Sequence, residues 1–167
     1  MKIILGTVQF GKNYGISNYK GRTPDDEIDE ILQLAYKNKI NILDTASRYG
    51  KSEKIISQYI KNNPRQDWQI ISKGSTIKDF YKSQELLGNS LTTFLAHDVK
   101  DFLSDKKLQN DLKLIKEDGL IKKIGVSVYS PDEIVKVLNN CNVDIIQLPL
   151  NILDHRLIKS GLLKNIK

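Results

Sequence analysis

The chain has 167 residues, of which 40% are hydrophobic and 28% charged, so we expect one globular domain over residues 1–167 rather than a disordered segment. The formal net charge of +6 lies on lysines that are mixed with Asp and Glu, without the basic runs and interleaved aromatics of single-strand binders. We interpret this charge as a solvated surface, and attraction of an anionic ligand such as a phosphorylated cofactor is the alternative. No apolar run approaches the roughly 20 residues of a membrane helix.

The single cysteine and the first residues both favour a cytoplasmic location. Because Cys141 is the single cysteine, the chain has no internal disulfide, and a reducing compartment is its natural setting. The apolar stretch within residues 1–6 is too short for a secretory signal peptide. We therefore expect a cytoplasmic protein that binds neither a membrane nor nucleic acid, and we assign no metal site.

Short apolar segments recur along the chain and are predicted to form strands. Most of them are apolar without interruption, which is typical of strands that are buried on both faces of a parallel sheet. The predicted strands are Ile3–Val8, Ile40–Leu43, Gln69–Ser72, Thr93–Ala96, Lys123–Ser127 and Val143–Leu148.

Helical spacing of apolar residues fills the segments between these strands. The first helix is predicted around Ile28–Ala35, with Thr23 as its N-cap and Pro24 at its first position. A later helix is predicted from the capping box Ser130–Glu133. Four further helices are predicted. One starts at Ser52 and ends before Pro64, and the next contains Leu86, Leu87 and Leu91. A third contains Leu108, Leu112 and Ile115 and ends at Gly119, and the last spans Leu157 to Ile166.

Repeated strand–helix alternation indicates right-handed crossovers and a parallel sheet. Two architectures fit this pattern, a doubly wound sheet and a (β/α)8 barrel. A doubly wound dinucleotide binder usually has a glycine-rich loop after its first strand, whereas Gly6, Gly11 and Gly15 are spaced too widely for that motif. Polar residues instead follow several different strands, which favours the barrel.

Four polar residues stand at or after the ends of the second, third and fourth predicted strands. They are Asp44, Tyr49, Lys73 and His97. Each alone has an ordinary structural interpretation, such as a turn residue, a packing group, a solvated lysine or a histidine at the margin of the core. Together they are more specific, because adjacent parallel strands place their C-terminal ends at the same rim.

The chemistry of these four groups suits reduction of a carbonyl. We expect an ion pair between Asp44 and Lys73, since either charge alone would be costly to desolvate. A lysine close to Tyr49 would lower the tyrosine pKa from about 10 and let the phenol donate a proton near neutral pH. His97 could hydrogen-bond the carbonyl oxygen and fix its orientation. The hydride would have to come from a cofactor.

The order of several motifs resembles the aldo-keto reductases along the whole chain. The most specific of them is the block from Asp-Thr-Ala to Tyr-Gly-x-Ser-Glu at 44–53. Two later segments, 127–133 and 147–157, resemble a bacterial branch of that family whose genes often lie near those for surface-sugar synthesis. The other matching motifs are Leu-Gly-Thr at 5–7, Ser-Lys at 72–73, His97, Ile-Gly-Val-Ser at 124–127 and Ile-Gln at 146–147.

This resemblance implies a (β/α)8 barrel that reduces aldehydes and ketones with NADPH, or sometimes NADH. It makes Tyr49 the proton donor, with Lys73 and Asp44 tuning it and His97 orienting the carbonyl. The residues implied to contact the cofactor are Gly6 and Thr7 in its groove, and Ser127 and Gln147 on the nicotinamide carboxamide. Val128 stands where many members have an asparagine, which removes one carboxamide partner, and the bacterial branch shares this valine.

The chain supplies about six βα units, whereas a complete barrel needs eight units and about 250 residues. We therefore expect a C-terminally incomplete barrel with two open edges, which self-associates or aggregates and binds NADPH weakly. Three hypotheses follow for its function: a carbonyl reductase acting on a small, sugar-related substrate, a non-catalytic remnant, or an incomplete subunit completed by another chain.

Overall fold

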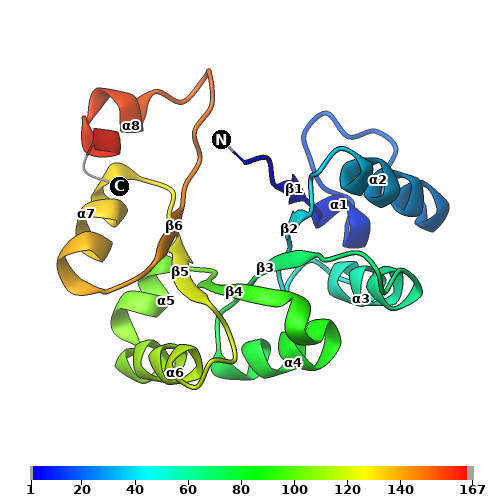
Figure 1. Cartoon of the computed structure of the whole chain (residues 1–167). Coiled ribbons are helices and arrows are strands. Elements are labelled where there is room, and N and C mark those ends of the chain that lie inside the picture. Colours follow the sequence, from blue (N-terminus) through cyan, green and yellow to red (C-terminus); the bar gives the residue numbers. More distant parts are fainter. Residues whose placement is uncertain (1, 165–167) are drawn as a thin grey trace.

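Six parallel strands form a curled sheet, in which each strand lies beside the strand that precedes it in the chain. The structure, a computed structural model, describes residues 2–164. In a doubly wound sheet the strand order would reverse at a switch point, and here it does not. The predicted partial (β/α)8 barrel is therefore confirmed, with helices on the outer side of an arc that is open between its first and last strands (Figure 1).

The strands and helices alternate as the apolar pattern predicts. The strands are β1 (Leu5–Gly6), β2 (Ile42–Asp44), β3 (Gln69–Gly74), β4 (Leu91–Ala96), β5 (Lys123–Ser127) and β6 (Ile145–Gln147). The helices are α1 (Val8–Gly11), α2 (Asp25–Lys37), α3 (Ser52–Asn62), α4 (Ile77–Leu87), α5 (Val99–Ser104), α6 (Lys106–Glu117), α7 (Pro131–Asn140) and α8 (Arg156–Lys159), with 3-10 turns η1 (Gly88–Ser90) and η2 (Leu162–Lys164). None of the helices within residues 2–164 is long and apolar enough to span a bilayer.

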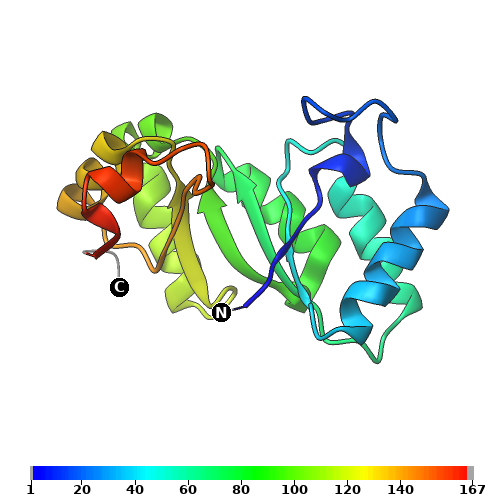
Figure 2. The same ribbon diagram turned by 90° about the horizontal axis from the view of Figure 1, so that it is seen from above.

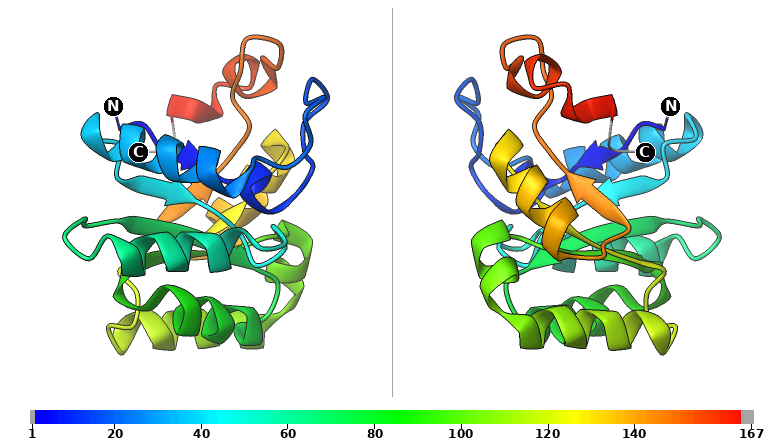
Figure 3. Two further views of the ribbon diagram at one scale, coloured as in Figure 1. Left: turned by 90° about the vertical axis from the view of Figure 1, so that its right-hand side faces the viewer. Right: turned by 90° about the vertical axis from the view of Figure 1, so that its left-hand side faces the viewer.

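The helices cover the convex face of the sheet and bury its side chains there. Helices α2 and α3 flank one end of the sheet and α7 flanks the other (Figure 2). Helices α4 and α6 lie next to each other on the outer side, and α8 lies on the opposite side of the arc (Figure 3). The buried core between helices and strands includes Leu32, Ile56, Phe80, Phe94 and Leu112, all without solvent exposure. This packing on one face leaves the C-terminal ends of the strands free to carry the polar residues.

The outermost strands are shorter than predicted. The segment Ile3–Val8 was expected to be a strand, but β1 contains only two residues and α1 begins at Val8. The predicted strand Val143–Leu148 is likewise reduced to the three residues of β6. Each of these strands has a single neighbour in the described part of the chain, so fewer ladder hydrogen bonds extend it. Ile3 and Ile4 are accordingly 62% and 45% exposed.

Two helix boundaries differ from the prediction because a neighbouring segment competes for the residue. Pro24, not Thr23, precedes α2, and the backbone N–H of Thr23 is bonded to the carbonyl of Gln9. The apolar spacing predicts Leu91 in the third helix, but this leucine is buried in β4 and paired with Ile70 of β3. The corresponding helix α4 is shifted toward the N-terminus and starts at a capping box that the prediction missed, formed by Thr76 and Asp79.

Of two predicted helix signals, the capping box at Ser130 is confirmed in part and the C-terminal glycine Gly119 in full. The Ser130 side chain accepts a hydrogen bond from the backbone of Glu133 at 3.3 Å, with Pro131 as the first residue of α7. The Glu133 carboxylate closes the turn on the backbone N–H of Tyr129 rather than on that of Ser130. After α6, Gly119 adopts the left-handed conformation, with φ of 75°, that a helix C-terminus favours.

The last predicted helix, Leu157 to Ile166, is interrupted. It becomes α8 and η2, separated at Gly161, whose φ is +71°. Ile166 lies outside the described residues. Helix α5 is not predicted from the sequence. Its N-cap is Asp98, whose carboxylate accepts a hydrogen bond from the backbone N–H of Lys100 at 2.7 Å.

A prediction concerns the contact between α1 and the loop after β2. A methyl group added at Gly11 would lie 1.7 Å from the carbonyl oxygen of Tyr49. We expect Gly11→Ala to lower the free energy of unfolding by about 1–3 kcal/mol, because backbone cannot move aside as a flexible side chain can. Gly6→Ala, whose methyl meets no atom within 4 Å, is the control in urea denaturation. Equal stability of the two variants would contradict this close approach.

Candidate active site

The C-terminal ends of β2, β3 and β4 bring together the four residues that the sequence singles out. Asp44 is the last residue of β2, Lys73 is the last but one in β3, and His97 directly follows β4. The ladder pairs Lys73 with Leu95, and the backbone N–H of His97 donates to the carbonyl of Gly74 at 2.9 Å. Tyr49 reaches the same rim from the loop that follows β2.

The expected ion pair between Asp44 and Lys73 is present. The Lys73 ammonium donates to Oδ1 of Asp44 at 2.6 Å and to the carbonyl of Thr45 at 3.0 Å. The side chain of Lys73 is only 3% exposed and that of Asp44 is 17% exposed. Burial lowers the pKa of Lys73, and the Asp44 carboxylate acts in the opposite direction by favouring the charged form.

Tyr49 and His97 lie beside this pair. Their ring centroids are 6.0 Å apart with the planes at 85°, and the Lys73 nitrogen is 5.4 Å from the centroid of the tyrosine ring. Burial lowers the pKa of His97, and the charges of Lys73 and Arg48 lower it further, so the imidazole is neutral near pH 7. Its Nδ1 is buried without a hydrogen-bond partner among the described residues.

The expected lowering of the Tyr49 pKa is wrong. Burial and the nearby Asp44 carboxylate instead raise the pKa of Tyr49 to about 12. The reason is that the Lys73 ammonium is bonded to Asp44 and to the carbonyl of Thr45, so the net charge beside the phenol is small. Tyr49 is thus held in its protonated form at neutral pH.

The residues expected to contact a cofactor lie at two places, at β1 and at the ends of β5 and β6. Gly6 is exposed, whereas the side chain of Thr7 is fully buried and its hydroxyl donates to the carbonyl of Asp44 at 2.9 Å. Thr7 therefore joins β1 to β2 through this hydrogen bond. Ser127 and Gln147 are register partners at the ends of β5 and β6.

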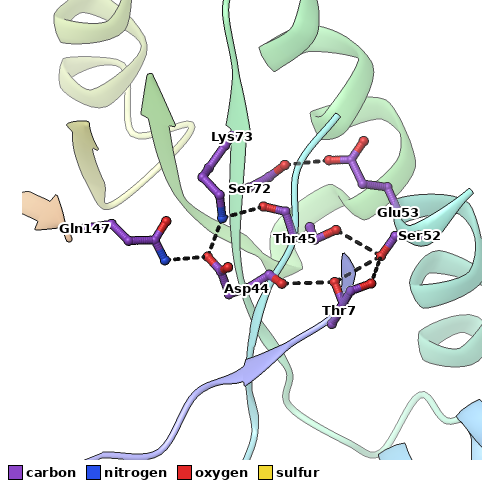
Figure 4. A network of polar contacts seen from close by, with 8 residues as sticks. All are labelled: Thr7, Asp44, Thr45, Ser52, Glu53, Ser72, Lys73 and Gln147. Carbon is purple, nitrogen blue, oxygen red and sulfur yellow. Dashed lines mark hydrogen bonds and ion pairs between the residues drawn. The ribbon is translucent and has the colours of Figure 1, made fainter. Parts of the chain in front are cut away.

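The side chain of Gln147 is already attached to the ion pair. Its Nε2 donates to Oδ1 of Asp44 at 3.0 Å, the oxygen that also accepts from Lys73 (Figure 4). A glutamine amide has a second N–H and a carbonyl oxygen, so it can also pair with a carboxamide. The neighbouring Val128 is 1% exposed and its backbone N–H donates to the carbonyl of Gln147, which fixes the backbone at this position. The donor and acceptor set of Ser127 and Gln147 thus fits a nicotinamide amide.

Sequence reasoning missed a second polar cluster behind the ion pair. The sequence pattern marks Ser52 only as a helix start and Glu53 only as part of a motif, yet both are buried, with exposures of 0% and 7%. They contact Thr45 and Ser72, which adjoin Asp44 and Lys73 in the chain (Figure 4). An acidic residue is usually solvated, so its burial could not be foreseen from the sequence.

Residues 2–167 match the sequence model of the aldo/keto reductase family. The chain belongs to this family. It is 27% identical over 137 residues to D-arabinose 1-dehydrogenase of Saccharomyces cerevisiae, which covers 70% of this chain and 41% of that protein. It is 24% identical over 138 residues to the chloroplastic pyridoxal reductase of Arabidopsis thaliana, covering 68% and 38% respectively. The chain thus spans about two fifths of the length of these curated relatives.

Solved aldo-keto reductases share the fold. PA4992 of Pseudomonas aeruginosa, described as an aldo-keto reductase, superposes with a TM-score of 0.80 at 23% identity, over 98% of this chain and 70% of that chain. The holo form of AKR11C1 from Bacillus halodurans superposes with a TM-score of 0.76 at 18% identity, over 99% and 58%. At these identities the likeness establishes the partial barrel and leaves the chemistry to the residues at its rim.

We expect the phenol of Tyr49 to ionise near pH 12, because burial and Asp44 disfavour the phenolate. At pH 11 only about a tenth of this group would be ionised, so wild type and Tyr49→Phe should show nearly equal phenolate absorbance up to that pH. Since the folded-state pKa is raised, the group stabilises the fold below pH 10 and loses that contribution as the pH rises toward 12. An absorbance difference that appears below pH 10 would contradict this assignment.

Proposed function

We propose that the chain carries the active site for NAD(P)H-dependent reduction of an aldehyde or ketone, with Tyr49 as the proton donor. The observation that carries this proposal is the convergence of Tyr49 and His97 beside the buried Asp44–Lys73 pair. Membership of the aldo/keto reductase family supports the reaction class. The nicotinamide cofactor supplies the hydride when it is bound.

In this proposal the four residues divide the work of moving one proton. The neutral imidazole of His97 hydrogen-bonds the carbonyl oxygen and directs it toward the phenol. Tyr49 holds its proton at neutral pH and releases it as negative charge grows on that oxygen. The phenolate that remains lies close to the Lys73 ammonium, whose charge stabilises it, while Asp44 keeps the lysine charged in its buried position.

We propose NADPH as the cofactor, with NADH as the alternative, held at its carboxamide by Ser127 and Gln147 and flanked by Gly6. The adjacent positions of Ser127 and Gln147 at the ends of β5 and β6 support this placement. Val128 supplies no side-chain hydrogen bond, so two polar partners hold the amide.

We propose a small, sugar-related carbonyl compound as the substrate. Similarity to a D-arabinose 1-dehydrogenase and to a glycerol dehydrogenase from Gluconobacter oxydans supports this class. We also propose that residues 1–167 act as a single domain in the cytoplasm, consistent with one continuous sheet and with the lone Cys141.

We expect Tyr49→Phe to lower the rate of carbonyl reduction by about 10²–10⁴-fold, the typical contribution of general acid catalysis. The ring remains and only the proton donor is lost, so NADPH binding followed by fluorescence should be unchanged. Tyr81→Phe on α4, where the tyrosine is 55% exposed, is the matched control and should retain full rate. Turnover close to wild type in the Tyr49 variant would mean that another group delivers the proton.

We further propose that the 167-residue chain self-associates through its open sheet edges. Both β1 and β6 have one neighbour in the described part of the chain, and the exposed Ile3 and Ile4 lie just before β1. An unprotected apolar edge is a template for pairing with another chain. Such pairing would fit the alternative hypothesis, in which the chain is a subunit that another chain completes.

Light scattering tests this proposal directly. We expect a molar mass above the 19.1 kDa of one chain, because two apolar edges remain available for pairing. Ile4→Lys should shift the protein toward the monomer, since a charge on an edge opposes pairing. The control is Leu86→Lys, at a leucine that is 38% exposed on α4, which packs against the inner strands β3 and β4. A monomeric wild-type chain at high concentration would exclude association through these edges.

A further inference from the structure

Two consecutive residues in the first turn of α3, Ser52 and Glu53, reach from the helix to the residues that adjoin the ion pair (Figure 4). Ser52 is fully buried and Glu53 is 7% exposed. Neither residue forms a hydrogen bond with Asp44 or Lys73. Their contacts are instead with the chain neighbours of the pair, one on each of the two strands.

Glu53 fixes the segment of β3 that carries Lys73. Its Oε1 accepts hydrogen bonds from the hydroxyl of Ser72 at 2.5 Å and from that of Ser83, on α4, at 2.7 Å. Ser72 immediately precedes Lys73, and neighbouring residues of a strand face opposite sides of the sheet. A fixed Ser72 therefore fixes the direction in which Lys73 leaves the strand. The carboxylate itself is stabilised by its place at the helix N-terminus and by these two hydroxyl donors.

Ser52 fixes the end of β2 in the same way. Its hydroxyl lies 3.1 Å from that of Thr45, which immediately follows Asp44. The carbonyl of Thr45 is the second acceptor of the Lys73 ammonium, at 3.0 Å. The Ser52 hydroxyl also lies 3.0 Å from that of Thr7, which is bonded to the carbonyl of Asp44. Both strand ends at the ion pair are thus attached to one turn of α3.

We propose that Ser52 and Glu53 are positioning residues, which hold the Asp44–Lys73 pair in register from the helix side of the sheet. They hold the side chains of Thr45 and Ser72, the chain neighbours of Asp44 and Lys73, and so set the distance between carboxylate and ammonium without contacting either. The consequence for catalysis rests on the proposed function, since the placement of Lys73 beside Tyr49 matters only if Tyr49 gives up its proton. The placement itself can be tested without turnover.

The two serines that donate to Glu53 offer a matched pair of variants. Ser72→Ala and Ser83→Ala each remove one hydroxyl from the same carboxylate oxygen, and both serines are fully buried. If Glu53 only attaches α3 to its surroundings, Ser72→Ala and Ser83→Ala should have similar effects on Lys73. The positioning role predicts that only Ser72→Ala changes Lys73, because Ser72 is its neighbour in the chain whereas Ser83 lies on α4.

The readout is the Lys73 ammonium in ¹⁵N NMR of the whole chain, assigned by its loss in Lys73→Met. We expect its proton exchange with water to be slow in the wild type and to speed up by about tenfold or more in Ser72→Ala and Glu53→Gln, as when a hydrogen bond to a charged group is weakened. Ser83→Ala should exchange within about twofold of the wild type. Glu85→Gln, at an exposed position of α4, controls for the loss of a negative charge.

Equal exchange rates in the Ser72 and Ser83 variants would overturn the proposal. Thr45→Val, which keeps the side-chain shape and removes the bond to Ser52, is the second arm if a serine variant does not fold. Its Lys73 exchange should also speed up, and an unchanged rate would equally overturn the proposal. Where the chain is active, Ser72→Ala should lower kcat more than it raises KM. Absence of carbonyl reduction in the wild type would count against Tyr49 as the proton donor and would leave the NMR comparison intact.

Discussion

The rim of this partial barrel depends on one buried ion pair. A lysine ammonium enclosed as Lys73 is would lose several kcal/mol of hydration free energy if it stood alone, and the Asp44 carboxylate offsets that loss. The same aspartate also organises its surroundings, because its carboxylate accepts from Gln147 of β6 and its backbone carbonyl accepts from Thr7 beside β1. Residues from four strands or their ends thus meet at Asp44, including the two strands at the open edges of the sheet.

The ion pair explains why the pKa of Tyr49 is higher in the structure than the sequence predicts. A lysine near a phenol is expected to lower the pKa of the phenol. The charge of Lys73 is offset by the Asp44 carboxylate, so burial dominates and raises the pKa of Tyr49. The outcome suits a proton donor, since the phenol keeps its proton until a carbonyl oxygen becomes basic. In the proposed reaction the lysine acts at a later stage. Its ammonium lies 5.4 Å from the centroid of the Tyr49 ring, and its charge would stabilise the phenolate that remains after proton transfer.

The bounds of a helix or strand could be predicted only where the local sequence determines them. Strand β5 was predicted at its observed bounds and Ser130 at its observed cap, because an apolar run and a serine before proline act locally. Strand β1 was overestimated because its length depends on neighbours that no local pattern reports. For the site, shared strand ends were enough to bring Asp44, Lys73 and His97 together. The burial of Thr7 and Glu53 required knowledge of which helix packs on which strand, and that is a property of the assembled fold.

Roles are also separated along the chain. The residues proposed to handle the proton lie between Asp44 and His97, on the neighbouring strands β2 to β4, and the buried turn of α3 that positions them lies within the same stretch. The residues proposed to hold the nicotinamide lie outside it, at Gly6 and on β5 and β6. Proton transfer therefore needs only contacts between adjacent units, which the open arc preserves. Cofactor binding as proposed would instead depend on how β6 sits relative to β1, and the Gln147–Asp44 hydrogen bond links β6 to the ion pair.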